Sequence, residues 1–289
     1  MEKYKRIFAN FVRVTIVLIA IAAILFSWLY YENIGVTSSS YNIYSAKLPS
    51  VFEGYKVALL SDFHNSDNYE KIYKHISDQK PDIIVLAGDM ISRSDENPEN
   101  WYNLSSLLDL LKGYPMYYSS GNHEKFLPRY NDYIAFLKEK GVTPLESELV
   151  EIEYRGSKIN LIGYKDNPFS EDVLRVEQMQ KEFSNLLKKA NDPDLFNILI
   201  CHRATLFDTV SEFPFDLVLS GHTHGGQIGV PGLNKLVLKY KYGIDNYVKG
   251  YYRNGDSQMV VSGGLSKIPT EPRFFNNPEV VFVTLRTAR

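Results

Sequence analysis

The sequence predicts an α/β fold, in which buried strands alternate with amphipathic helices and the central strands run largely parallel. The first observation is a set of short apolar runs, bounded by Gly, Pro, Asp or His, at residues 56–61, 82–87, 197–201 and 216–220. The second is helical spacing of apolar side chains at residues 69–78, 99–111, 129–140 and 171–189, the last with Ser170 as N-cap. The third is one strongly apolar segment near the N-terminus, which predicts a transmembrane helix ahead of this domain.

Composition and charge exclude several classes of protein. The chain has 289 residues, 32 basic and 34 acidic side chains, a net charge of −2 and a pI near 6.3. A protein that coats DNA or RNA needs an excess of Lys and Arg, so we expect no nucleic-acid partner. The single cysteine, Cys201, excludes an intramolecular disulfide, and its place at the end of an apolar run predicts a core residue rather than a metal ligand.

The apolar segment covers residues 14–31, which include no charged side chain. At about 1.5 Å per residue, a helix of this length nearly spans a bilayer core of about 30 Å. Basic side chains dominate residues 1–13, and Glu32 follows the segment, so the positive-inside rule predicts a cytoplasmic N-terminus and a single-pass protein of the cell membrane. The alternative is a cleaved signal peptide, but its apolar core is about 7–15 residues long and ends in an A-x-A-like site, and neither condition fits well.

The next stretch, residues 32–47, is rich in Ser and has no hydrophobic periodicity. It is predicted to be a linker, either a short tether or an edge strand. The domain outside the membrane is expected to cover residues 48–289, beginning near Leu48, with a strand-rich C-terminal part.

Side chains that bind metals follow each of the predicted strands. In chain order they are Asp62, His64, Asp89, Asn122, His202, His222 and His224, with His123 next to Asn122. Because ligands bind at the carboxyl ends of strands in α/β sheets, we expect these side chains to converge on one edge. Only His75, among six histidines, lies outside these groups, and it is predicted to be an ordinary surface residue.

Each group is weak evidence when it is taken alone. Asp62-Phe63-His64 fits a turn with a surface histidine, and Gly88-Asp89 fits a strand end capped by Asp. Gly221-His222-Thr223-His224 is more specific, because two histidines two residues apart in an extended chain point to the same side. The ordered set, with one group after each strand, is what predicts a metal site.

This ordered set, D-x-H, G-D, G-N-H-E, H and G-H-x-H, resembles the calcineurin-like metallophosphoesterase superfamily. Leu48-Pro49, Gly225-Gly226-Gln227 and Pro272-Arg273-Phe274 resemble its membrane-associated branch, the YkuE-like phosphoesterases and UDP-2,3-diacylglucosamine hydrolases. The resemblance implies a four-layer α/β/β/α sandwich that holds two divalent metal ions. It assigns Asp62, His64 and His224 to the first ion, Asn122, His202 and His222 to the second, and Asp89 as the bridge.

The ligand chemistry favours Mn, with Fe or Zn as alternatives, because oxygen donors are mixed with imidazoles and thiolates are lacking. The expected reaction is in-line attack on phosphorus by a metal-activated hydroxide. The resemblance implies that His123 faces the substrate rather than a metal. We expect it to be the general acid or to stabilise the leaving oxygen, and Glu124 is expected to orient its ring. Arg93 is a candidate for phosphate binding, although an exposed arginine at a helix start explains it equally well.

The local sequence also bears on the substrate. Protein phosphatases of this superfamily carry G-D-x-V-D-R-G and R-G-N-H-E, whereas this chain has Ser92 and Ser94 around Arg93, and Ser120 before Gly121, which disfavours a protein substrate. A membrane anchor favours a phosphorylated amphiphile or lipid-linked phosphate, such as a UDP-diacylglucosamine-type pyrophosphate.

The alternatives are a phosphodiesterase with broad specificity for soluble or cell-wall substrates, and a non-catalytic metal-binding membrane protein. Basic and Tyr residues between positions 235 and 253 fit either contact with anionic headgroups or a Tyr-rich hairpin that covers the fold.

Overall fold

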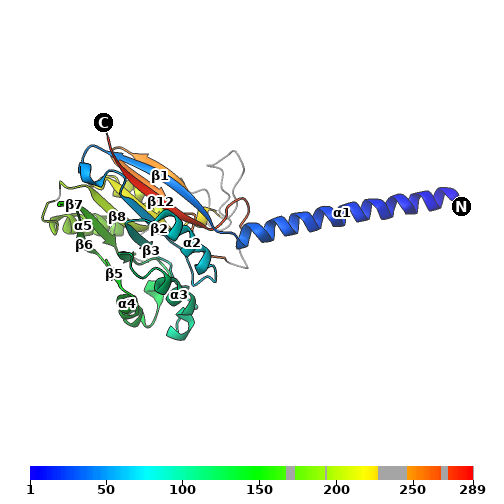
Figure 1. Cartoon of the computed structure of the whole chain (residues 1–289), viewed down its shortest axis with the longest axis horizontal. Coiled ribbons are helices and arrows are strands. Elements are labelled where there is room, and N and C mark those ends of the chain that lie inside the picture. The colour runs from blue at the N-terminus through cyan, green and yellow to red at the C-terminus, as the bar shows by residue number, and fades with distance from the viewer. Residues whose placement is uncertain (167–172, 193, 227–245, 268–272, 289) are drawn as a thin grey trace.

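The computed structural model describes residues 1–166, 173–192, 194–226, 246–267 and 273–288. Two six-stranded mixed sheets pack face to face, and helices cover the outer face of each sheet (Figure 1). This arrangement confirms the predicted α/β/β/α sandwich. One long helix at the N-terminus, α1 (Glu2–Ile34), extends away from the sandwich.

The first sheet has a parallel centre and a mixed edge. Its spatial order is β1 (Thr37–Ser45), β12 (Glu279–Thr287), β2 (Lys56–Leu60), β3 (Ile83–Ala87), β4 (Met116–Ser119) and β5 (Val142–Pro144). Strands β2 to β5 are parallel, whereas β12 is antiparallel to β2 and parallel to β1. The predicted parallel centre is therefore present, with a mixed edge built from the two ends of the chain.

The second sheet has a parallel centre and antiparallel edges. Its order is β10 (Gly250–Asn254), β11 (Ser257–Val261), β9 (Leu217–Gly221), β8 (Asn197–Arg203), β7 (Ser157–Tyr164) and β6 (Glu148–Tyr154). Neighbours from β11 to β7 are parallel, and the two outer pairs are hairpins.

In the described part of the sandwich, four helices correspond to the predicted segments, and one short helix was not predicted. They are α2 (Tyr69–Gln79), α3 (Tyr102–Leu110), α4 (Tyr130–Glu139), α5 (Val173–Lys188) and the short α6 (Phe207–Val210). Short 3₁₀ turns occur at Ser50–Phe52, Pro98–Trp101, Glu124–Phe126, Ala204–Leu206 and His224–Gly226. The start of the predicted helix at residues 99–111 is one of these turns, with Pro98 at its first position. The predicted cap Ser170 lies outside the described residues.

Alternation of side chains along the strands builds three apolar layers. Val57 and Leu59 of β2 point between the sheets, whereas Ala58 and Leu60 point outward against the helices, including Ile72 of α2. Burying each large apolar side chain contributes about 1.5–3 kcal/mol. The third layer lies between the second sheet and α5, and it contains Cys201, as the sequence predicts.

Helix α1 is long and apolar enough over Glu2–Trp28 to cross a membrane. After it, the Ser-rich stretch forms the edge strand β1 rather than a tether, pairing Thr37 with Glu279. The sheet therefore begins ahead of Leu48, where the domain was expected to start. The sequence signal is weak because Ile43 alone is fully buried in β1.

The strand directions place the end of α1 near one particular edge of the sandwich. Thr37, at the start of β1, pairs with Glu279, and Leu59, near the end of β2, pairs with Val281 two residues later in β12. The carboxyl ends of β2, β3 and β4 therefore lie at the end of the sheet from which α1 leaves.

Candidate metal centre

All seven predicted ligands lie at the carboxyl ends of strands from both sheets. Asp62 and His64 follow β2, Asp89 follows β3, Asn122 follows β4, and His222 and His224 follow β9. His202 differs slightly from the prediction, because it lies inside β8 at a shift of the pairing register rather than after the strand. The two sheets thus supply the two halves of one cluster.

The backbone at these positions is held in an unusual conformation. Positive φ angles, which cost energy for residues other than glycine, occur at Asp62, His64, Asp89, His222 and His224. The packing is also tight, because a Cβ placed on Gly121 would collide with Asp89 Oδ1. Such strain at adjacent loops is typical of a functional site.

Asp89 is the centre of the cluster. Its Oδ2 lies 3.2 Å from His202 Nε2 and 3.9 Å from both His64 Nε2 and His123 Nε2. On the other side, Asp62 Oδ1 lies 3.5 Å from His224 Nε2 and 4.0 Å from His202 Nε2. A carboxylate placed between two groups of imidazoles has the position of a bridging ligand.

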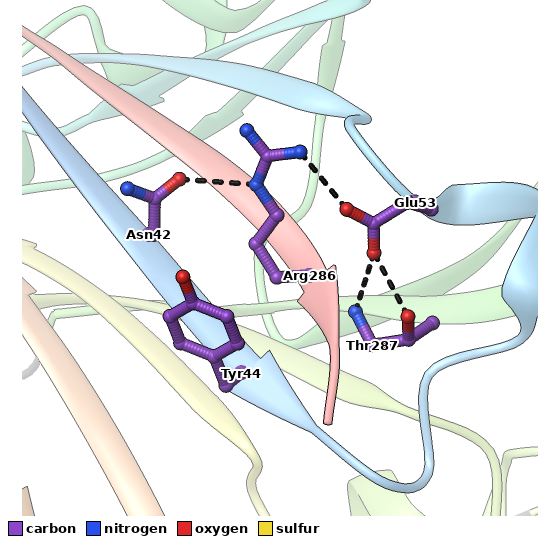
Figure 2. A pocket seen from close by; sticks show the side chains of 5 residues that line it. All are labelled: Asn42, Tyr44, Glu53, Arg286 and Thr287. Carbon is purple, nitrogen blue, oxygen red and sulfur yellow. Dashed lines mark hydrogen bonds and ion pairs between the residues drawn. The ribbon is translucent and has the colours of Figure 1, made fainter. Parts of the chain in front are cut away.

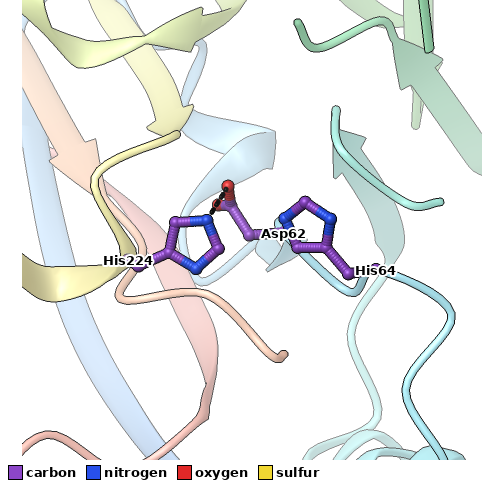
Figure 3. Close-up of side chains that lie close together, drawn as sticks. All are labelled: Asp62, His64 and His224. Carbon is purple, nitrogen blue, oxygen red and sulfur yellow. Dashed lines mark ion pairs between the residues drawn. The ribbon is translucent and has the colours of Figure 1, made fainter. Parts of the chain in front are cut away.

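Three ligand groups of suitable geometry overlap in this cluster. The groups are Asp62–His64–His224, His64–Asp89–His123 and Asp89–His202–His222. Figure 3 shows the first group, in which Asp62 lies near the rings of His64 and His224, whose centroids are 5.1 Å apart. Because His123 Nε2 is as close to Asp89 as His64 Nε2 is, distance alone does not separate its role from that of a ligand.

Hydrogen bonds fix the direction of three rings. The Nδ1 atoms of His64, His202 and His224 lie 3.1, 2.7 and 3.1 Å from Ser92 Oγ, Ala87 O and Ser266 Oγ. These contacts direct the Nε2 atoms toward the carboxylates. Histidines that bind metals commonly have the other ring nitrogen held in this way.

Buried polar atoms show that the residues fit bound metal ions. His64 Nε2 and Asn122 Oδ1 are buried with no hydrogen-bond partner in the described part of the chain. A buried polar atom left unpaired costs about 1–3 kcal/mol, and bound cations beside these two atoms would remove that cost. The clusters are consistent with a binuclear site of nitrogen and oxygen donors.

Burial shifts the pKa values of several side chains in the cluster. Burial raises the pKa of the Asp62 carboxyl to about 6, against the effect of His202. Burial alone would also raise the pKa of Asp89, but His202 and its neighbours hold it well below its ordinary value. Burial lowers the pKa of His64 to about 3 and that of His224 well below its ordinary value, so both rings are neutral, the form that binds metals.

Glu124 does not orient His123, which corrects the expectation from the sequence. Its carboxylate accepts backbone N–H bonds from Asp89 and Gly121 at 3.0 Å each, and another from Met90. Burial, followed by repulsion from Asp89, raises the pKa of Glu124 to about 8. Glu124 therefore joins the loop of Asp89 to the loop that carries Asn122.

The ring of His123 is held from the other side, by Arg93. The backbone N–H of Arg93 donates to His123 Nδ1 at 3.3 Å. The His123 side chain is 30% exposed, which makes it accessible from solvent. Arg93 lies in an exposed turn rather than at a helix start, and its guanidinium stacks on Phe126 at 4.0 Å.

A buried ionic network that the sequence does not suggest lies next to His222. Asp166 accepts from Lys125 Nζ at 2.5 Å and from Arg203 Nε at 2.9 Å, and Arg203 Nη1 lies 3.5 Å from His222 Nε2. Lys125 and Arg203 directly follow Glu124 and His202, but nothing in the sequence indicates their shared partner. Two cations against one carboxylate leave positive charge beside the cluster, which favours an anionic substrate.

The prediction for His75 needs correction. His75 is half-buried, and its Nε2 lies 2.9 Å from the carbonyl of Val36, so it is not a free surface residue. Within the segment 235–253, the part before residue 246 is outside the described residues, which leaves its contact with headgroups a prediction. Lys249, one of the basic residues of this segment, forms an ion pair of 3.1 Å with the buried Glu279.

A separate pocket of about 580 Å³ lies at the opposite end of β1 and β12 (Figure 2). It is lined by Asn42, Tyr44, Glu53, Arg286 and Thr287, and the Arg286–Glu53 ion pair of 2.9 Å lies across it. None of these five residues belongs to the His/Asp cluster, so this pocket is not the metal centre.

Known proteins resemble this chain in family, in sequence and in structure. The model of the calcineurin-like phosphoesterase family matches residues 55–226. The uncharacterized metallophosphoesterase YkuE of Bacillus subtilis is 27% identical, with 89% of this chain and 88% of the relative covered. An uncharacterized metallophosphoesterase of Aquifex aeolicus is 28% identical, with 92% and 98% covered. The crystal structure of TT1561 of Thermus thermophilus aligns with a TM-score of 0.47 and 13% identity, covering 73% of this chain and 90% of that one.

The family match covers more than half of the chain and extends from before Asp62 to beyond His224. It therefore includes every residue of the buried His/Asp cluster described above. On this match and this cluster, the chain belongs to the calcineurin-like phosphoesterase family and is a metal-dependent phosphoesterase.

Proposed function

We propose that this protein is a membrane-anchored phosphoesterase that hydrolyses a phosphodiester or pyrophosphate bond in a lipid-linked phosphate, with UDP-diacylglucosamine as the model for the substrate. The observation that carries the proposal is the shared end of the first sheet, where α1 leaves and the metal-binding loops gather. If α1 spans the bilayer, the cluster lies on the side of the domain that faces the headgroups. A phosphate attached to a lipid is then presented to the cluster without leaving the membrane.

The distances support the division of ligands between two ions. Asp62, His64 and His224 would hold the first ion, Asn122, His202 and His222 the second, and Asp89 would contact both. Mixed oxygen and imidazole donors suit Mn first, and Fe or Zn as alternatives. Two such ions supply Lewis acidity for phosphoryl oxygens and lower the pKa of bound water.

His123 is proposed as the general acid for the leaving oxygen. Its Nδ1 accepts the N–H of Arg93, so the proton of the neutral ring is placed on Nε2, the atom that faces Asp89. A proton at that position lies beside the cluster and can be donated to the leaving group. Arg93, held by its stacking on Phe126, is proposed to contact a phosphate oxygen of the substrate.

Removing the apolar part of α1 is expected to reduce turnover of a lipid substrate without changing hydrolysis of a soluble one. Deletion of residues 1–27 keeps Asn33 and β1, both of which contact the domain. We expect kcat/KM on soluble bis(p-nitrophenyl) phosphate to change less than about two-fold, and turnover of UDP-diacylglucosamine in vesicles at low substrate to fall on the order of 10²-fold, because effective concentration is lost. Equal losses on both substrates would favour the phosphodiesterase of broad specificity.

The proposed orientation places the domain outside the cell and the N-terminus in the cytoplasm. A membrane-impermeant thiol reagent tests this, because the native Cys201 is buried. Tyr102→Cys, at a position 66% exposed on the domain, is expected to react in intact cells, whereas Tyr4→Cys, at a position 77% exposed before the apolar core, is expected to react only after lysis. The reverse pattern would place the metal centre in the cytoplasm.

A further inference from the structure

The last turn of α1 contacts the chain segment that supports His224. Asn33 forms two hydrogen bonds with the backbone of Arg273, donating to its carbonyl at 2.8 Å and accepting from its N–H at 2.6 Å. One turn earlier along the helix, the Trp28 ring lies 4.6 Å from that of Phe275. The helix end and residues 273–275 are therefore held together by polar and aromatic contacts.

The side chain of Arg273 runs from this junction into the metal-binding loops. The residue is only 3% exposed, and burial lowers its pKa to about 10 even though Asp62 and Glu279 oppose the shift. Its guanidinium donates to the carbonyls of Gly263 at 2.6 Å, Ser266 at 3.1 Å and His224 at 3.3 Å. A buried arginine that bonds these three carbonyls fixes the loop of residues 263–266 relative to the loop that carries His224.

Both loops determine the position of the His224 ring. The Ser266 hydroxyl lies 3.1 Å from His224 Nδ1 and 3.4 Å from Arg273 Nη2. The carbonyl of His224 also accepts from Asn276 at 2.7 Å, and its backbone has a φ of 50°. A shift of Arg273 would therefore move the ring partner and the backbone partner of His224 together.

We propose that Asn33 is a positioning residue for His224, acting through Arg273, so that the end of α1 is a structural part of the metal centre. Partners outside the ligand set commonly change metal affinity by about 10–100-fold when they are removed. Asn33 contacts His224 only through Arg273, so we expect its removal to change metal affinity by about ten-fold, the lower end of this range. The inference uses the proposed assignment of His224 as a ligand of the first ion.

A second bond between α1 and the domain provides a matched control. Lys71 Nζ donates to the carbonyl of Ile34 at 2.8 Å, which holds the helix end to α2 instead of to Arg273. Lys71→Met and Asn33→Ala both weaken attachment of the helix. Only Asn33→Ala removes the contact that leads to His224.

The experiment compares the full-length protein, Asn33→Ala and Lys71→Met in detergent after loading with Mn²⁺. Metal content is measured against increasing chelator, and we expect Asn33→Ala to lose one of its two equivalents at about ten-fold lower chelator, while Lys71→Met matches the unmodified protein. Arg273→Met is expected to change in the same direction and by more. Identical chelator curves for Asn33→Ala and Lys71→Met would overturn the inference.

Hydrogen exchange in the metal-free protein gives a readout that does not depend on bound metal. Amides of residues 222–226 and 263–266 are expected to exchange faster in Asn33→Ala than in Lys71→Met. Equal exchange in the two variants would overturn the positioning role. Unmodified protein that binds no metal would instead contradict the proposed function, and hydrogen exchange would still decide the inference.

Discussion

Replacing Asp89 by Asn is expected to release both metal ions and to reduce kcat/KM by more than about 100-fold. Removing a partner outside the ligand set already costs about 10–100-fold, and Asp89 has its Oδ2 at the centre of the cluster, 3.2 Å from His202 Nε2. An amide keeps the size of the side chain. Its oxygen can still accept the backbone N–H of His123, which in the unmodified protein donates to Asp89 Oδ1 at 2.8 Å. The measurement is metal content by elemental analysis, which should fall from close to two equivalents per chain, together with turnover of a soluble diester.

The control for this variant is Asp82→Asn, the same change just before the other end of β3. Asp82 is exposed, and its carboxylate accepts the backbone N–H of Lys56 at 2.7 Å, far from the cluster. It should keep two metal equivalents and full activity. Unchanged metal content and turnover in Asp89→Asn would exclude a binuclear centre bridged by this residue.

Replacing His123 by Ala is expected to lower kcat on the order of 10²–10⁴-fold while both metals stay bound. This range is the usual contribution of a well-placed acid or base. His123 differs from the proposed ligands because its ring is partly exposed and its Nδ1 is held by the backbone of Arg93. Substrates with a good leaving group, such as nitrophenol, should be affected less than alkyl esters, because they need less protonation.

Metal analysis of the same variant decides between the two roles that the geometry allows. If His123→Ala lost a metal equivalent, the residue would be a ligand through the His64–Asp89–His123 group. His75→Ala serves as the control, because His75 contacts the carbonyl of Val36 away from the cluster. Metal retention with unchanged turnover would exclude His123 as the general acid.

The positions of the cluster were predictable because local sequence determines them. Each buried strand is a short apolar run, and the polar residue that follows lies at the strand end whatever the rest of the chain does. Convergence of Asp62, Asp89 and His202 then follows from the topology of the sheets. The order of the groups along the chain carries this information even though each group is weak.

The supporting contacts were not predictable, because they join residues that are distant in the sequence. Glu124 bonds the backbone of Asp89, 35 residues away, although its place beside His123 suggests a local partner. Asn33 and Arg273 are 240 residues apart. Strand β1 gave little signal for another reason, since an edge strand with Ile43 as its one fully buried residue lacks the apolar alternation of a core strand.

The insertion of β12 between β1 and β2 has a consequence for biosynthesis. The first strand to leave the ribosome can complete its ladder only with Glu279–Thr287, the last strand of the chain. Until that strand is made, β1 and the free edge of β2 have no partner, and exposed edges of this kind invite association with other chains. The first sheet therefore closes only after residues 279–287 have been translated, and until then the nascent protein exposes two strand edges to its neighbours.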